Sequence, residues 1–101
     1  MEIEFELRGI RFRWNAEQEQ ANIRKHDGIT LRRAAQVLFD TFVVNEDAAR
    51  NDEARDGAIG MDFDYCVLFV VHIVCEDDHI RIISAKKAEP RQRKRYEDRN
   101  P

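Results

Sequence analysis

The chain has 101 residues, of which 43% are hydrophobic and 37% are charged, with a formal net charge of −3. This length leaves room for one modest core, so we expect a single domain over residues 1–101. The longest apolar run, residues 66–71, is too short to span a bilayer, and the charged N-terminus does not resemble a secretory signal, so the expected location is the cytoplasm.

Alternating side chains predict a β-hairpin at the start of the chain. Residues 2–7 alternate glutamate with apolar side chains, and residues 10–14 alternate apolar side chains with arginine. A period of two is typical of half-buried strands. Arg8 and Gly9 supply a turn between the two runs, so the segment is expected to fold back on itself.

Two helices are predicted after the hairpin. Asn15 is suited to cap a helix over residues 16–26, and Gly28 is suited to end it. Thr30 is suited to cap a second helix over residues 31–40, in which apolar residues recur at helical spacing.

The next part of the chain predicts strands. Residues 42–44 are expected to form a short strand. Residues 65–75 are expected to form a central strand, because they are rich in β-branched and aromatic side chains. Residues 79–84 return beside it after an acidic turn. Residues 45–64 contain seven acids and two glycines, which predicts an irregular or mobile loop.

A last helix is expected from Pro90 onward, because proline suits the first turn of a helix. The predicted order, ββααβββα, describes a small α+β domain with an antiparallel sheet and helices packed against it. Cys66 and Cys75 bracket the central strand and are expected to be small core residues rather than a disulfide, since a reducing cytosol is assumed.

The sequence offers little support for a metal or cofactor. Neither cysteine belongs to a CxxC pair, and the three histidines lack recurring ligand spacings. Phosphate-binding glycine loops and a serine-nucleophile elbow are absent. No metal and no cofactor are therefore expected. His72 is interpreted as a core or sheet-face residue and His79 as a solvated one.

Cationic residues are the remaining candidates for chemistry. Residues 81–101 carry eight of the 17 Lys and Arg residues and a net charge of +5, whereas residues 1–80 carry −8. Such a basic segment is typical of a surface that binds phosphate groups. Arg81, followed by Lys86 and Lys87, could grip a phosphate; the alternative is that Arg81 protects an edge strand from aggregation.

Lys25 and His26 end the first predicted helix. Cations at this position are favoured by the helix dipole whether or not they have a function. In the last helix, pairs such as Arg93 and Glu97 could be purely stabilising. A role in chemistry and a role in helix stability both remain open for these residues.

Several motifs occur together in one order along the chain. Residues 14–40 read W-N-x6-N-I-R-K-H-D-G-I-T-L-R-R-A-A-Q-V-L-F-D, followed by Arg55, Ile59-Gly60 and the VLFVV strand. R-I-I-S-A-K-K-A and R-x-R-Y-E follow at residues 81–88 and 93–97. In this combination the chain resembles the BrnT family of ribonuclease toxins, and the resemblance implies one BrnT-like domain with a fold akin to that of RelE toxins.

The resemblance implies a function in the cytoplasm. It implies a bacterial type II toxin that cleaves RNA without a metal and inhibits translation. Its partners would be RNA and a cognate DNA-binding, BrnA-like antitoxin that forms a hetero-oligomer with it, and no membrane is involved. The catalytic residues expected are His26 for proton transfer and Lys25, Arg81 and Lys86 for the phosphate, and the RNA-binding residues are Lys87, Arg93 and Tyr96, with Tyr96 also a reserve acid.

An inactive toxin homologue is the alternative. Glu17 and Gln18 stand where the family usually has lysines, so positive charge that attracts phosphate is missing there. The protein would then bind RNA or another protein without catalysis.

Overall fold

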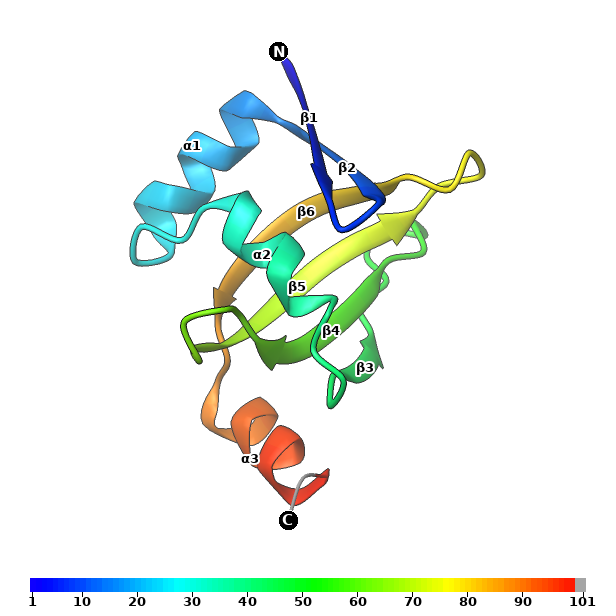
Figure 1. Ribbon diagram of the computed structural model, residues 1–101. Helices are drawn as coiled ribbons and strands as arrows, with labels where there is room; N and C mark the ends of the chain where they lie inside the picture. The colour runs from blue at the N-terminus through cyan, green and yellow to red at the C-terminus, as the bar shows by residue number, and fades with distance from the viewer. Residues whose placement is uncertain (100–101) are drawn as a thin grey trace.

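The computed structural model describes residues 1–99, which form a six-stranded sheet with three helices (Figure 1). Asn100 and Pro101, at the end of the basic segment, lie outside the described residues. The sheet order is β1-β2-β6-β5-β4-β3. The strands are β1 (Glu2–Leu7), β2 (Ile10–Asn15), β3 (Val44–Asp47), β4 (Asp56–Met61), β5 (Val67–Val74) and β6 (Ile80–Lys87), and the helices are α1 (Ala16–Lys25), α2 (Leu31–Val37) and α3 (Pro90–Arg99).

The N-terminal half folds as its sequence pattern predicts. β1 and β2 pair antiparallel, and Arg8 and Gly9 form the turn with φ of 51° and 85°. Asn15 caps α1 and Thr30 caps α2, each accepting a hydrogen bond from the backbone amide three residues later. α2 ends at Val37, earlier than predicted.

The segment predicted as an irregular loop is instead a β-hairpin. β3 pairs antiparallel with β4, and together with the turn between them they form residues 44–61, the β3–β4 hairpin. The strand predicted over residues 42–44 is displaced, since β3 begins only at Val44. The prediction for residues 45–64 was therefore wrong.

β4 escaped prediction because its sequence, DGAIGM, contains two glycines. A Cβ atom on Gly57 would lie 2.7 Å from the Phe69 ring, and one on Gly60 would lie 3.1 Å from the Asp40 carboxylate. These glycines serve close packing in a buried strand, whereas in sequence they are typical of a loop.

The sheet is mixed, so the prediction of an antiparallel sheet was wrong at one pairing. β2 runs parallel to β6, with Phe12 opposite Ile80 and Arg13 opposite Arg81. The predicted element order is roughly right, with one strand missing from it. β6 lies between β2 and β5 at this point, so Arg81 is not on a sheet edge, contrary to the edge-protection alternative.

A β-bulge in β6 decides which of its side chains share a face. Ile82 and Ser84 lie opposite two consecutive residues of β5, so Ile83 is an additional residue. Side chains of a strand alternate between faces, and the additional residue places Ser84 on the same face as Arg81. Strict alternation without the bulge would instead place Ser84 on the face of Ile80 and Ile82.

Each face of the sheet carries its own hydrophobic cluster. The larger one packs beneath α2 and includes Trp14, which is fully buried. The smaller one packs beneath α3, and we call this side of the sheet the α3 face (Figure 1). Its buried members are Val44, Ile59, Val67 and Tyr96. Cys66 and Cys75 are half-buried free thiols at opposite ends of β5.

The side chain of Asn22 holds α1 against β6. β2 pairs with β6 only as far as Arg81, which leaves the later part of β6 without a strand on that side. The buried Asn22 donates from Nδ2 to the carbonyl of Ala85 at 2.9 Å and accepts from the Ala85 amide at 3.0 Å. Nδ2 also donates to the carbonyl of Ile29 at 3.0 Å. α1 therefore occupies the place of a further strand.

We expect Asn22→Ala to lower the free energy of unfolding by about 3 kcal/mol, because it leaves buried backbone groups of Ala85 and Ile29 without partners. Urea denaturation followed by circular dichroism measures this change. Gln18→Ala, an exposed truncation in the same helix, is the matched control and should change the free energy by less than about 1 kcal/mol. Equal effects of the two variants would contradict this role of Asn22.

His72 and His79 are both buried but differ in the partners of their side chains. His72 is buried, as expected, but its Nδ1 has no hydrogen-bond partner within residues 1–99. Burial lowers the pKa of His72, although the nearby Asp56 carboxylate opposes the shift. His79, predicted in solvent, is buried, and its Nδ1 contacts the Asp77 carboxylate.

Because the pKa of His72 is below its ordinary value of 6.5, the folded chain binds fewer protons at this residue than the unfolded chain. The free energy of unfolding should therefore fall as pH drops from about 8 to about 5.5, and part of that fall should disappear in His72→Phe. Urea denaturation at several pH values measures both curves. Parallel curves for the two proteins would show that His72 makes no such contribution.

Candidate functional site

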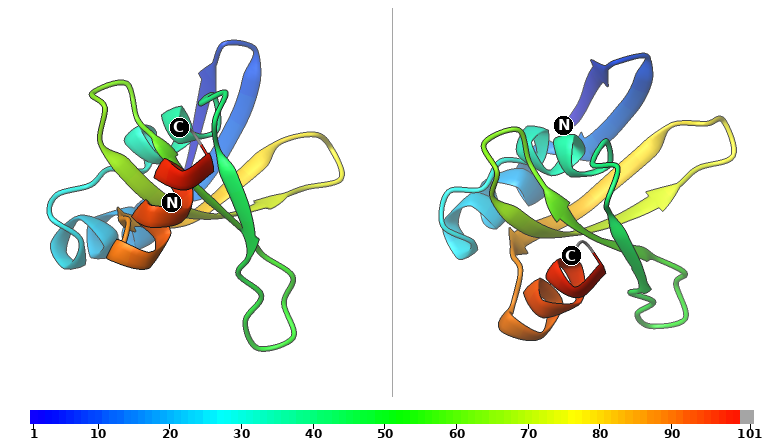
Figure 2. Two further views of the ribbon diagram at one scale, coloured as in Figure 1. Left: turned by 90° about the horizontal axis from the view of Figure 1, so that it is seen from below. Right: turned by 60° about the horizontal axis from the view of Figure 1, so that its bottom comes forward.

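A polar pocket of about 350 Å³ lies where α1, β6 and the tip of the β3–β4 hairpin meet. Its lining includes Ser84, next to the bulge of β6. Figure 2 shows α1 and the hairpin on opposite sides of α3. Four side chains that are cationic or can become so line the pocket: Lys25, His26, Arg50 and Arg55.

Three of these four side chains have no partner in the part of the chain that the structure describes. Within the described residues, the side chains of Lys25, His26 and Arg50 make neither a hydrogen bond nor an ion pair. Arg55 donates from Nε to Oε1 of Glu53 at 2.7 Å. The pocket therefore offers positive charge that the chain does not itself neutralise, which suits an anionic ligand.

Local structure fixes the end of α1 at the pocket. Asn22 anchors the helix to β6, and its carbonyl accepts a hydrogen bond from the amide of His26 at 2.9 Å. Asp27 and Gly28 then turn the chain away, with φ of 55° and 75°. Lys25 and His26 consequently stand at the negative end of the helix dipole, which favours positive charge.

Arg81 shares the α3 face with Ser84 but is not part of the pocket lining. Its guanidinium forms an ion pair with Glu2 of β1. The structure thus brings Lys25 and His26 together as candidates and leaves Arg81, near the start of β6, outside the pocket lining. Its assignment to the phosphate stays a prediction.

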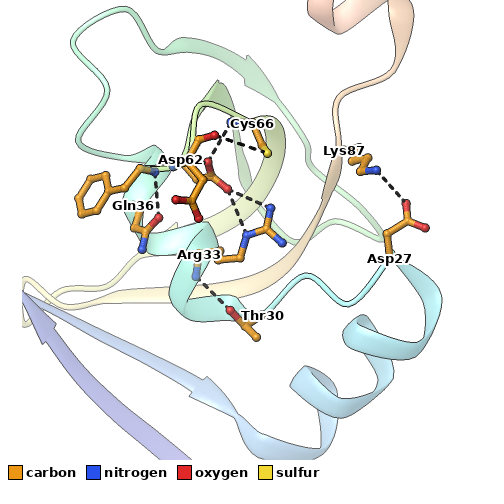
Figure 3. A network of polar contacts seen from close by, with 9 residues as sticks. Asp27, Thr30, Arg33, Gln36, Asp62, Cys66 and Lys87 are labelled. Carbon is orange, nitrogen blue, oxygen red and sulfur yellow. Dashed lines mark hydrogen bonds and ion pairs between the residues drawn. The ribbon is translucent and has the colours of Figure 1, made fainter.

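Lys86 and Lys87 lie on different faces of β6. Lys86 is opposite Phe69 on the α3 face and donates to Oε1 of Glu89 at 2.7 Å. Lys87 is on the other face, 4.0 Å from the carboxylate of Asp27 in the turn after α1 (Figure 3). Their roles with RNA stay predictions.

The cations of α3 are largely paired with nearby acids. Glu46 of β3 accepts from Arg95 at 2.7 Å and from Arg91 at 3.5 Å. Arg93 pairs with Glu97 at 3.3 Å, the interaction that its spacing predicted. The RNA-binding role of Arg93 stays a prediction, and the basic segment carries much less free charge than its composition indicates.

Tyr96 links α3 to the segment that follows α2. Its hydroxyl donates to Oδ2 of Asp40 at 2.5 Å, and the same carboxylate oxygen accepts from the amide of Met61 at 2.8 Å. Burial and the hydrogen bond to Asp40 raise the pKa of Tyr96 to about 12. Burial alone would raise the pKa of Asp40, but its hydrogen bonds outweigh burial and lower it. This geometry favours a structural role for Tyr96 over the predicted role of reserve acid.

Tyr96→Phe should therefore lower the free energy of unfolding by roughly 1–2 kcal/mol, because it removes a hydrogen bond to a carboxylate. RNA cleavage at a temperature where the variant is folded should be unchanged. Thermal denaturation and a cleavage assay with fluorescent RNA measure the two quantities. Loss of cleavage without loss of stability would return Tyr96 to the chemistry.

A second polar network has a structural role (Figure 3). The buried Asp62 accepts from Nε and Nη2 of Arg33 at 3.1 Å and 3.0 Å. Its other oxygen accepts from the amides of Asp64 and Cys66, both at 2.9 Å. Every one of these groups has a partner within the network, so it fixes α2 to the turn between β4 and β5.

Arg50 and Arg55 were not among the site residues expected from the sequence. They lie in a segment with an excess of acids, where an arginine is most simply a solvated charge. The one available signal was the occurrence of Arg55 among the family motifs. Their convergence on α1 depends on the hairpin that the sequence pattern did not reveal.

Residues 1–99 contain neither a cluster of metal ligands nor a helix that could span a membrane. No group of three or more His, Cys, Asp or Glu side chains there could hold a metal ion. No helix in that range has the length and apolar character needed to cross a membrane.

The fold and the pocket define a small α+β protein with a polar pocket lined by cationic side chains. Residues 14–92 match the family described as “Ribonuclease toxin, BrnT, of type II toxin-antitoxin system”, and the chain belongs to this family. The resemblance seen in its motifs is thereby confirmed. The matched range contains every residue of the pocket. The family implies an antitoxin as partner. No curated protein matches the sequence.

Proposed function

We propose that this chain is an endoribonuclease toxin that cleaves RNA without a metal and thereby inhibits translation in the cytoplasm. The observation that carries the proposal is the pocket, in which the side chains of Lys25, His26 and Arg50 have no partner among residues 1–99. It lies wholly within the residues that match the ribonuclease family.

The reaction assigned to the pocket needs few groups. His26 takes the proton from a 2′-hydroxyl, and the 2′-oxygen then forms a bond to the adjacent phosphorus. The bond from phosphorus to the 5′-oxygen breaks, and that oxygen takes a proton from water. Lys25 stabilises the charge that develops on the phosphate. The products are a 2′,3′-cyclic phosphate and a 5′-hydroxyl. An imidazole nitrogen can accept the proton of a hydroxyl, and a fixed positive charge stabilises the phosphate in the transition state.

The other predicted cations extend the RNA-facing surface in this proposal. Arg81 and Lys86 share the α3 face with Ser84 and are each held by a single acid. Exposed ion pairs of this kind contribute little stability, so a phosphate can replace the acid at small cost.

The proposed partner is a cognate BrnA-like, DNA-binding antitoxin that forms a hetero-oligomer with this chain. The family supports a partner of the antitoxin class. The free cations of the pocket support an acidic contact surface on that partner. We also propose that the fold is akin to that of RelE toxins, on the resemblance of the motifs alone.

His26→Ala should lower the rate of RNA cleavage by roughly 10²–10⁴-fold, because it removes the group that takes the proton. The measurement is cleavage of a fluorescent mixed-sequence RNA in EDTA. Lys94→Ala, which removes an exposed cation of α3 paired with Asp98, is the control and should cleave as the parent does. Arg81→Ala, outside the pocket, should lose less activity than His26→Ala.

Two outcomes would count against this assignment. If His26→Ala cleaved at the parent rate, His26 would not be the proton-transfer group. If Arg81→Ala abolished cleavage and His26→Ala did not, the reaction would take place on β6 outside the pocket.

An RNA-binding protein without catalysis is the second candidate. It is favoured by Glu17 and Gln18, which place an acid and a neutral residue on α1 where the family usually has lysines. RNA that binds with steep salt dependence but stays intact, both as free RNA in EDTA and on ribosomes in magnesium buffer, would support this candidate.

A further inference from the structure

We propose that the tip of the β3–β4 hairpin is a phosphate clamp, in which Arg50 and Arg55 hold one phosphate of single-stranded RNA against α1. This inference rests on the proposed function and deepens it, because it names the part of the RNA that the hairpin side of the pocket binds. The two arginines come from a segment outside the helix that carries Lys25 and His26.

The hairpin tip is a regular turn that can hold side chains in place. Arg50 and Glu53 exchange two backbone hydrogen bonds, at 3.0 Å and 2.9 Å. Asn51 and Asp52 between them both have positive φ, 51° and 63°, as a two-residue type I′ turn requires. Arg50 and Arg55 thus extend from a paired ladder and not from a flexible loop.

Arg55 is oriented by its own neighbour on the hairpin. Glu53 accepts from Nε of Arg55 at 2.7 Å, and the two terminal nitrogens of the guanidinium have no partner among the described residues. A guanidinium held at Nε still presents its terminal donors to a phosphate oxygen. The side chain of Arg55 is 25% exposed, so it is confined by its surroundings yet still reaches solvent at the pocket.

Arg50 contributes more unpaired positive charge to the pocket than Arg55 does. Glu53 partly neutralises Arg55, whereas Arg50 has no acidic side-chain partner within residues 1–99. Both arginines line the pocket opposite Lys25 and His26. A phosphate between these walls would contact cations on two sides, which matches the charge of an RNA backbone. A pocket of about 350 Å³ has room for roughly one nucleotide.

The test measures binding separately from cleavage. The probe is a fluorescent 2′-O-methyl RNA of mixed sequence, which lacks the attacking hydroxyl and stays intact. Its dissociation constant is measured by anisotropy at several salt concentrations for the parent, Arg50→Ala, Arg55→Ala and the control Lys94→Ala. Circular dichroism shows whether each variant is folded.

We expect Arg50→Ala and Arg55→Ala each to weaken binding about tenfold, and the double variant to lower the salt slope by about 0.7, the value for one phosphate on a single strand. Lys94→Ala, with the same change in net charge, should bind as the parent does. Arg55→Lys keeps the charge but loses the fork, so it should fall between parent and Arg55→Ala.

Glu53→Gln gives a change in the opposite direction. The amide oxygen can still accept from Nε of Arg55, but the negative charge is gone, so RNA should bind more tightly than to the parent. A purely structural role of the Glu53–Arg55 pair would not produce tighter binding. Unchanged or weaker binding by folded Glu53→Gln would therefore overturn the orienting role assigned to Glu53.

The outcomes separate the clamp from the nuclease. Equal weakening by Arg50→Ala, Arg55→Ala and Lys94→Ala would overturn the clamp, since charge alone would explain binding. Normal binding by both hairpin variants, with cleavage of ordinary RNA by the parent, would overturn the clamp and leave the ribonuclease function standing. The expected binding pattern without any cleavage would support the clamp and count against the ribonuclease.

Discussion

One buried amide connects the sheet, the helix and the pocket. Asn22 occupies the hydrogen-bonding positions of β6 that β2 leaves open beyond Arg81. An exposed strand edge would otherwise be available there to another chain, and an apolar side chain could not satisfy its backbone groups. Because the helix takes the place of a strand, its last turn comes beside the bulge of β6. Lys25 and His26 reach the pocket for this reason.

In this protein, the number of basic residues in a segment does not indicate how many of them lack an acidic partner. The C-terminal segment holds eight of the 17 basic residues, yet α3 and β6 pair most of them with acids such as Glu46 and Glu89. The carboxylate of Glu89 shows the same coupling, since its hydrogen bond with Lys86 lowers its pKa. Within residues 1–99, Lys25 and His26 at the end of α1 and Arg50 of the acidic hairpin have no such partner. Local charge balance, and not the count of lysines and arginines, marks the candidate surface.

Local patterns predicted most of the secondary structure. The caps at Asn15 and Thr30 and the alternation of the first hairpin depend on neighbouring residues alone, so the sequence shows them directly. β4 could not be predicted because Gly57 and Gly60 are required for close packing against Phe69 and Asp40, which are distant in the chain. The parallel pairing of β2 with β6 is likewise a long-range feature. Of the site, the end of α1 was predicted, and the arginines of the hairpin were not, because only tertiary structure brings them there.

The bulge in β6 has a consequence for changes in chain length. Ile83 is an additional residue, and the segments on either side of it are each in register with β5. Loss of Ile83 would close the ladder into a regular pairing and would leave Arg81, Ser84 and Lys86 on the face they occupy now. A deletion elsewhere in β6 would instead reverse the sides of the residues beyond it. Homologous chains that differ in length here can therefore lose or gain a residue at this one position and still keep a basic face and a hydrophobic face.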